Sequence, residues 1–235
     1  MHKALKNAVK AGLLSRNVAE AVDRPKVTRH EMKVMSETDL RLFLEMAQNT
    51  EYYALFYTLL FTGMRRAEAL ALRWQDVDLL LCQISVNRSM QYLDNAPIED
   101  RITFKQPKTE KSRRLIALSP STAAVLREHR EIQDKQRVAF KLSPITDIDL
   151  VFSHWNGTPL LPNSVTHAWI KLTRRCGLNG IRLHDARHTH ASLLLKQGVH
   201  PKIVQERLGH AGIAITLDLY SHGGSRTSTS RCQQI

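Results

Sequence analysis

The segment 183–222 carries four side chains that together could attack a phosphodiester. His184 and Arg187 are three residues apart, so on a helix they would lie on one face and reach one common anion. His210 follows a glycine, and Tyr220 comes ten positions later. Two imidazoles, a guanidinium and a phenol are the groups that this chemistry needs. Because His184 or Tyr220 alone is better explained as a core side chain, the prediction depends on all four occurring together.

A second cationic motif lies upstream, where Arg65 follows the glycine of Thr62-Gly63 and precedes Glu68 by three residues. A helix that starts here would favour anions at its N-terminus, and Arg65 would add a bidentate phosphate donor. Taken alone, the two charged residues are better explained as a surface ion pair of i,i+3 spacing. Arg66, the next residue, is assigned no chemistry.

Three lysines, Lys105, Lys108 and Lys111, fall in a polar stretch between two predicted strands, 101–104 and 113–118. The stretch predicts a hairpin with lysines at its tip, where one ammonium could reach a leaving oxygen. The alternative is an ordinary solvated turn.

Charge and cysteine content bound the class of protein. The net charge of +12 over 235 residues predicts a polyanionic partner, although a merely basic soluble protein is the alternative. Three cysteines without a C-x-x-C pair argue against a disulfide framework or a zinc knuckle and suit a reducing cytoplasm. The N-terminus has no apolar signal-peptide core, and the most apolar run, 54–64, is shorter than the roughly 20 residues of a membrane span.

A metal site is disfavoured. His184 and His188 have the four-residue spacing of helical metal ligands, but the sequence contains no H-E-x-x-H motif, and Asp185 does not share their face. We therefore expect neither a metal nor another cofactor.

Apolar periodicity and capping residues predict a mainly α-helical (α+β) fold with one small antiparallel β-sheet. Ser36 and Asp39 form a predicted capping box, and Pro120 occupies a first helical turn. Strands are expected at 80–90, 101–104, 113–118 and 150–152, and helices at 4–14, from 37, 51–61, 65–72, 121–136, 162–176, 185–196, 201–208 and 213–219.

The motifs taken together resemble the tyrosine recombinases, the phage integrase family. Residues 62–68 match its first box, T-G-[Met/Leu]-R-x-x-E, and 107–118 match P-K-T followed by Ser, Arg, an aliphatic residue and Leu. Residues 183–191 match L-H-D-x-R-H-T-x-A, and 208–222 match L-G-H followed after ten residues by the tyrosine. The resemblance implies a tyrosine-recombinase catalytic fold and a site-specific DNA recombinase or integrase that forms a covalent 3′-phosphotyrosine intermediate.

The resemblance also implies a site and an organisation. It requires no cofactor and places Glu68 in a supporting role. The six residues to which it assigns catalysis are Arg65, Lys108, His184, Arg187, His210 and Tyr220. It implies the last helix of a truncated core-binding domain plus a linker at 1–30, a catalytic domain at 31–222 and a flexible tail at 223–235. We expect the tail to be disordered from its composition. Expected partners are double-stranded DNA and further copies of the protein, in a tetrameric synapse of the full-length form, in a prokaryotic or phage-type cytoplasm.

The sequence departs from the family pattern at two places, and two alternative functions stay open. Ala67 stands where the family usually has Gly or Ser, and the tail after Tyr220 lacks the pattern of the helix by which the family commonly docks on a neighbouring protomer. A type IB topoisomerase would use similar chemistry to religate the same strand. A non-catalytic basic DNA-binding domain would share the charge but would not need the six-residue set.

Overall fold

The computed structural model describes residues 2–22, 33–106 and 113–209. The chain divides into two compact units, Met1–Glu31 and Met32–Ile235. In the first unit, helix α1 spans His2–Lys10, and a 3-10 turn, Val18–Ala21, follows. The side chain of Asn17 caps that turn by accepting a hydrogen bond from the backbone N–H of Ala19 at 3.1 Å. None of the described helices is long and apolar enough to cross a membrane.

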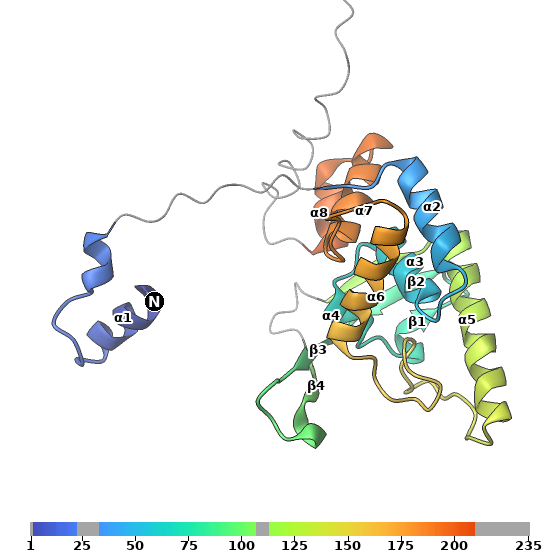
Figure 1. The fold of residues 1–235 in the computed structure, drawn as a ribbon, viewed down its shortest axis with the longest axis horizontal. Coiled ribbons are helices and arrows are strands. Elements are labelled where there is room, and N and C mark those ends of the chain that lie inside the picture. Colours follow the sequence, from blue (N-terminus) through green and yellow to red (C-terminus); the bar gives the residue numbers. More distant parts are fainter. Residues whose placement is uncertain (1, 23–32, 107–112, 210–235) are drawn as a thin grey trace, which may run out of the picture. The chain divides into compact units, whose positions relative to one another are not determined.

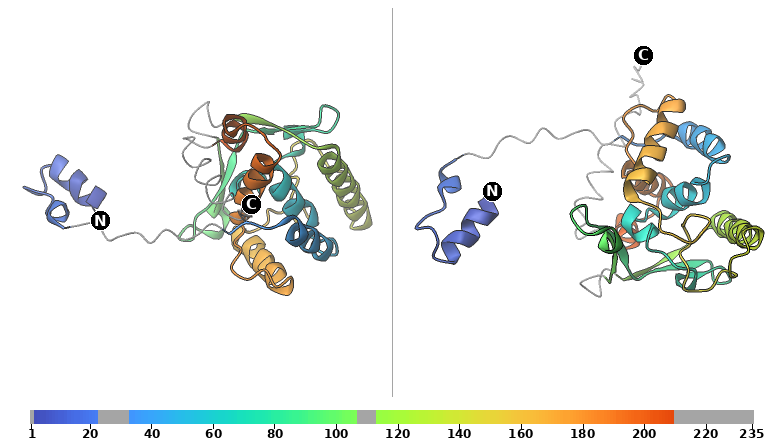
Figure 2. Two further views of the ribbon diagram at one scale, coloured as in Figure 1. Left: turned by 90° about the horizontal axis from the view of Figure 1, so that it is seen from above. Right: turned by 60° about the horizontal axis from the view of Figure 1, so that its bottom comes forward.

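The second unit is mainly helical, with small antiparallel sheets beside the helices (Figures 1 and 2). Its strands are β1 (Val77–Asp78), β2 (Gln83–Val86), β3 (Ser89–Tyr92), β4 (Ile102–Lys105) and β5 (Arg114–Ala117). Its helices are α2 (Glu37–Ala47), α3 (Tyr53–Thr62), α4 (Arg66–Ala69), α5 (Pro120–Ala139), α6 (Pro162–Arg175), α7 (Asp185–Lys196) and α8 (Pro201–Leu208), with 3-10 turns at Trp74–Asp76 and Ile98–Asp100. This architecture confirms the predicted fold class.

Local sequence signals place the helix ends. Ser36 and Asp39 form the predicted capping box of α2, and Ser119 caps α5 with Pro120 in its first turn. The predicted helix 65–72 is shorter than expected, because after α4 the backbone tightens into i,i+3 hydrogen bonds such as Ala71 N–H to Glu68 C=O.

A helical core carries the domain. The rings of Phe43 (α2) and Phe56 (α3) pack against Trp169 (α6), with centroids 4.5 and 5.2 Å from it. All three side chains are buried. A smaller apolar cluster, which includes Val204 and Leu208, joins α7 to α8. These contacts hold α3, α7 and α8 in place, and the candidate site lies at their ends.

The predicted hairpin between 101–104 and 113–118 is wrong. β4 pairs with β3, with Met90 opposite Phe104, and β5 pairs with β2, with Ile84 opposite Ile116. Since β2 and β3 are separated only by Asn87 and Arg88, they offer both later strands a partner. Among the described strands, β1-β2-β5 form one sheet and β3-β4 another.

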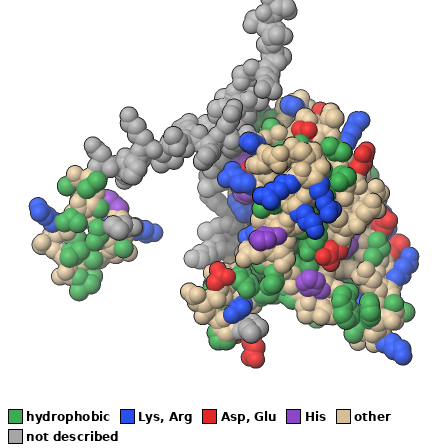
Figure 3. Space-filling view, viewed as in Figure 1, with side chains coloured by type: hydrophobic (Ala, Val, Ile, Leu, Met, Phe, Trp, Pro, Cys, Tyr) green, Lys and Arg blue, Asp and Glu red, His purple; other side chains and the backbone are tan. Residues whose placement is uncertain are grey.

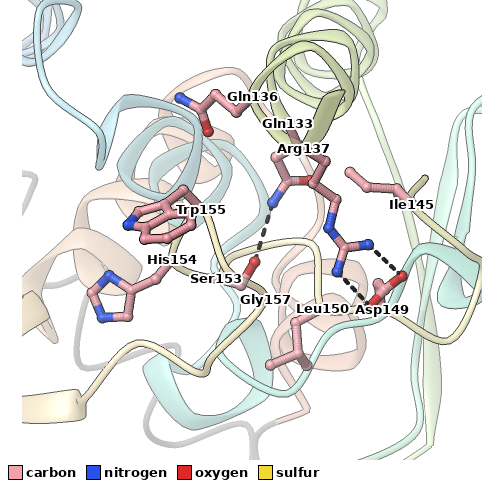
Figure 4. A pocket seen from close by; sticks show the side chains of 10 residues that line it. All are labelled: Gln133, Gln136, Arg137, Ile145, Asp149, Leu150, Ser153, His154, Trp155 and Gly157. Atoms are coloured by element: carbon pink, nitrogen blue, oxygen red, sulfur yellow. Dashed lines mark hydrogen bonds and ion pairs between the residues drawn. The ribbon is translucent and has the colours of Figure 1, made fainter. Parts of the chain in front are cut away.

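The predicted strand 150–152 is also wrong, since Leu150 makes only an isolated bridge with Arg73. Side chains of α5 take the place of a neighbouring strand: Gln133 Nε2 donates to the carbonyl of Val151 at 2.9 Å and to Ser153 Oγ at 3.4 Å. Figure 4 shows Gln133 and the Arg137–Asp149 ion pair lining the small pocket between α5 and this loop.

Candidate active site

Arg65 stands directly before α4, where the chain leaves α3 through a tight turn. Gly63 ends α3 in the left-handed conformation, with φ at 66°. A Cβ on Gly63 would come within 2.4 Å of Leu208 Cδ2 and 2.7 Å of a His190 ring carbon, so any side chain would push α7 and α8 away. The glycine of the first motif therefore has a structural cause, which is the close approach of three helices.

Glu68 holds Arg65 from one turn further along. Its carboxylate accepts from the Arg65 backbone N–H at 2.9 Å and from Arg65 Nη1 at 2.7 Å. The predicted i,i+3 ion pair is therefore present, but it is not a surface pair, because the Glu68 side chain is 9% exposed. Burial alone would raise the pKa of Glu68, but hydrogen bonds and charge from Arg114, together with hydrogen bonds from Arg65, lower that pKa to about 2.

Arg187, on α7, is the most buried of the candidate arginines at 3% exposure. Its Nη1 donates to the carbonyl of Gly63 at 2.7 Å, and its Nη2 donates to the carbonyl of Leu208 at 2.5 Å. Burial lowers the pKa of Arg187 to about 9, and the charge of Arg65 acts in the same direction. The guanidinium stays charged at pH 7, and an anion bound beside the two arginines would relieve their mutual repulsion.

Arg65 and Arg187 lie side by side. Arg65 Nη2 donates to the carbonyl of Gly209 at 2.9 Å, next to the Leu208 carbonyl that Arg187 holds. Arg65 is the more accessible of the two, with 44% of its side chain exposed. Two forked cations on neighbouring carbonyls can contact the non-bridging oxygens of one phosphate.

His184 begins α7 as its N-cap residue and is exposed. Together with Arg187, Arg66 and Arg182, it lines a cavity of about 520 Å³. Partial burial lowers the pKa of His184, and the charge of Arg187 lowers it further. His184 is therefore a neutral imidazole at pH 7, able to accept a proton. Figure 3 shows Lys and Arg side chains gathered on the face where α6 and α7 lie.

Of the predicted catalytic residues, Arg65, His184 and Arg187 come together. Lys108, His210 and Tyr220 lie outside the described residues, as do the predicted helix 213–219 and the tail. The rings of His184 and His188 meet edge to face with centroids 5.0 Å apart. No group of three or more His, Cys, Asp or Glu side chains that could hold a metal occurs within 2–22, 33–106 and 113–209. Arg66, to which no chemistry is assigned, donates from Nη1 to the carbonyl of Pro162 and to the hydroxyl of Thr166, both on α6.

Sequence reasoning missed His190 on α7 and Arg207 on α8, which are hydrogen-bonded to each other. Arg207 Nε donates to His190 Nε2 at 3.1 Å, and Arg207 Nη2 donates to the carbonyl of Ala117 at 2.8 Å. Burial lowers the pKa of His190 to about 3, helped by the charge of Arg207. Only the T-x-A spacing of the second box marked His190, and that pattern gives it no role.

The low pKa of His190 predicts acid lability. The folded state keeps His190 neutral down to about pH 3, whereas the unfolded chain protonates it near pH 6.5. Its contribution to stability is therefore complete above pH 6.5 and is lost as pH falls toward 3, by about 3 kcal/mol between pH 7 and pH 4. Urea unfolding at these two pH values should show a smaller loss for His190→Gln than for wild type. His167→Gln, at an exposed position on α6, should keep the wild-type loss; an unchanged loss in His190→Gln would contradict the assignment.

The arrangement of helices and small sheets is that of a tyrosine-recombinase catalytic domain. The sequence profile of the phage integrase family matches residues 33–225, and the chain belongs to this family. It is 30% identical to the ICEBs1 integrase of Bacillus subtilis (strain 168) over 224 residues, which cover 94% of this chain and 59% of that protein.

Another curated relative and two solved structures are also similar to this chain. A protein named tyrosine recombinase XerC-like, from Caldanaerobacter subterraneus, is 29% identical over 87% of this chain and 54% of its own length. The chain thus spans little more than half the length of these curated relatives. The Tn1549 transposon integrase, solved with a circular intermediate DNA, matches with a TM-score of 0.72 at 19% identity, over 93% of this chain and 71% of that chain. A lambda integrase dimer bound to a COC' core site matches at 0.66 and 15% identity, over 99% and 74%.

Proposed function

We propose that this chain is the catalytic part of a site-specific DNA recombinase that cleaves and rejoins strands through a 3′-phosphotyrosine intermediate. The observation that supports this most strongly is the pair formed by Arg65 and Arg187, held on successive carbonyls at the end of α8. Positive charge fixed before the substrate arrives stabilises the charge that develops on a phosphodiester under attack.

In the proposed reaction, the hydroxyl of Tyr220 attacks the phosphorus. The bond between Tyr220 Oη and phosphorus forms as the bond from phosphorus to the 5′-oxygen breaks. His184 takes the phenol proton, and Lys108 gives a proton to the departing 5′-oxygen. Arg65, Arg187 and His210 donate to the non-bridging oxygens. The covalent link preserves the phosphodiester bond, so a 5′-hydroxyl of another strand can reverse the step and join to it.

The chemistry also defines the proposed partners. The substrate is double-stranded DNA, to which the net charge of +12 is suited. Each protomer has one nucleophile and opens one strand, so exchange between two duplexes requires four protomers. We propose that the full-length protein assembles on DNA as a tetrameric synapse. The relatives named above come from bacteria, so we place the reaction in the cytoplasm of a prokaryotic cell.

The test is to trap the intermediate. The 235-residue chain is incubated with a pool of nicked duplexes in EDTA. The nick lets the short 5′-hydroxyl fragment diffuse away, which leaves the protein attached. We expect an adduct that survives denaturant, a linked peptide that contains Tyr220, and linked DNA that can be sequenced. A reaction that requires a divalent metal, or a linkage at another residue, would refute the proposal. Sequenced junctions between different duplexes distinguish recombination from topoisomerase-like closure of the same strand.

A further inference from the structure

The last turn of α8 is held by three arginines at once. The carbonyl of Arg207 accepts from Arg114 Nε at 2.8 Å, that of Leu208 from Arg187 at 2.5 Å, and that of Gly209 from Arg65 at 2.9 Å. Final carbonyls of a helix have no partner within the helix and carry its negative dipole end. Three guanidiniums therefore satisfy three successive acceptors, and two of those guanidiniums belong to the proposed catalytic set.

Arg114 links this turn to the carboxylate that holds Arg65. Its Nη1 and Nη2 donate to the two oxygens of Glu68 at 3.1 and 2.7 Å, while its Nε holds the Arg207 carbonyl. Its side chain is 8% exposed. The same Glu68 oxygens accept from Arg65, so one chain of contacts runs from Arg114 through Glu68 to Arg65.

The geometry assigns Arg114 to positioning and not to phosphate contact. Each of the three nitrogens of its guanidinium, Nε, Nη1 and Nη2, already donates to a protein acceptor. Arg113, the residue directly before β5, is exposed, and its Nη2 donates to Gln106 at 3.1 Å. The two consecutive arginines thus have different environments, and of the two only Arg114 contacts the site.

We propose that Arg114 is a positioning residue for strand cleavage: it fixes Glu68, and through Glu68 the guanidinium of Arg65, against the last turn of α8. This inference rests on the proposed function. Without Arg114, the two Glu68 oxygens lose the donors that fix their position beside Arg65, and the Arg207 carbonyl loses its donor. Arg65 then loses the orientation that matches a phosphate, although its own side chain is unchanged.

The test compares single-turnover adduct formation by the full chain at saturating nicked DNA. Arg114→Met should lower the rate by about 30-fold, with DNA affinity within about threefold of wild type, because it removes orientation and not a DNA contact. Arg113→Met is the matched control and should keep the wild-type rate. Arg114→Lys retains a cation for folding but cannot donate to three acceptors in one plane, so its rate should fall between the two.

A double-substitution cycle separates positioning from general damage to the fold. In an Arg65→Ala background, Arg114→Met should cost less than about threefold further, since its effect passes through Arg65. Full additivity of the two losses, or a wild-type rate in both Arg114 variants, would overturn the inference.

A measurement without DNA tests the positioning of Arg65 separately from the proposed function. In ¹⁵N spectra of the folded protein, the side-chain Nε–H of Arg65 should exchange with water faster in Arg114→Lys than in wild type or Arg113→Met. Unchanged exchange would refute the positioning role even if wild type proves unable to cleave DNA. A wild type that forms no adduct while exchange does change would refute the proposed function alone.

Discussion

Tyr220→Phe should abolish the covalent protein–DNA adduct and leave DNA binding intact. The substitution removes the single oxygen that would bond to phosphorus and keeps the ring, so the contact surface changes little while the nucleophile disappears. The other proposed groups can still bind the phosphate, but none of them forms the tyrosyl ester. The measurement is the denaturing-gel adduct assay on nicked DNA, paired with a binding titration on the same DNA.

Tyr57→Phe is the matched control for Tyr220→Phe. Tyr57 lies on α3, where its ring packs against Phe61 at 4.5 Å, and its hydroxyl has no part in the proposed site. That variant should form the adduct at the wild-type rate. An adduct that persists in Tyr220→Phe, or moves to another tyrosine, would show that the nucleophile has been assigned wrongly.

Features that depend on nearby residues were predictable from the sequence. The start of α2 follows from Ser36 and Asp39, and the start of α5 from Ser119 and Pro120, because a cap and its partner lie within four residues. Strand pairing was not predictable in this way. The partner of β4 depends on whether β3 or β5 offers the better edge, and a polar stretch between two strands does not decide that.

The same contrast applies to the candidate site. Arg65, His184 and Arg187 were identified because their spacing matched family motifs, and the fold brings them together. Arg114 was part of a motif but had no assigned role, since its acceptors are Glu68 and a backbone carbonyl 93 residues away. A backbone acceptor leaves no signature in side-chain chemistry. Residues that position catalytic groups through main-chain hydrogen bonds are therefore the part of the site that could not be predicted from the sequence.

Arg187→Lys should lower the rate of adduct formation by roughly 10³-fold while keeping the charge of the site. Lysine has one ammonium, which cannot donate to the Gly63 and Leu208 carbonyls and to a phosphate in the planar geometry of a guanidinium. The three N–H groups of an ammonium sit on one nitrogen, which cannot occupy the positions of both Nη1 and Nη2. One of the two buried carbonyls would then lose its donor, and an unsatisfied buried acceptor costs about 1–3 kcal/mol. The variant should therefore also unfold at a lower urea concentration than wild type.

Arg182→Lys separates the loss of the guanidinium fork at Arg187 from a general change in the cavity. Arg182 lines the same cavity, but its side chain is 67% exposed and pairs with Asp185 at 3.3 Å. The Asp185 carboxylate is buried, but it also accepts from the backbone N–H of Arg182 at 2.7 Å, a contact that lysine keeps together with the positive charge. This variant should therefore keep the wild-type stability and stay within about threefold of the wild-type rate. The rates of adduct formation by Arg187→Lys, Arg182→Lys and wild type are compared on folded protein, without urea and at saturating DNA. An Arg187→Lys rate within tenfold of wild type would show that charge alone is sufficient at this position, and that the paired forks of Arg65 and Arg187 are not what stabilises the transition state.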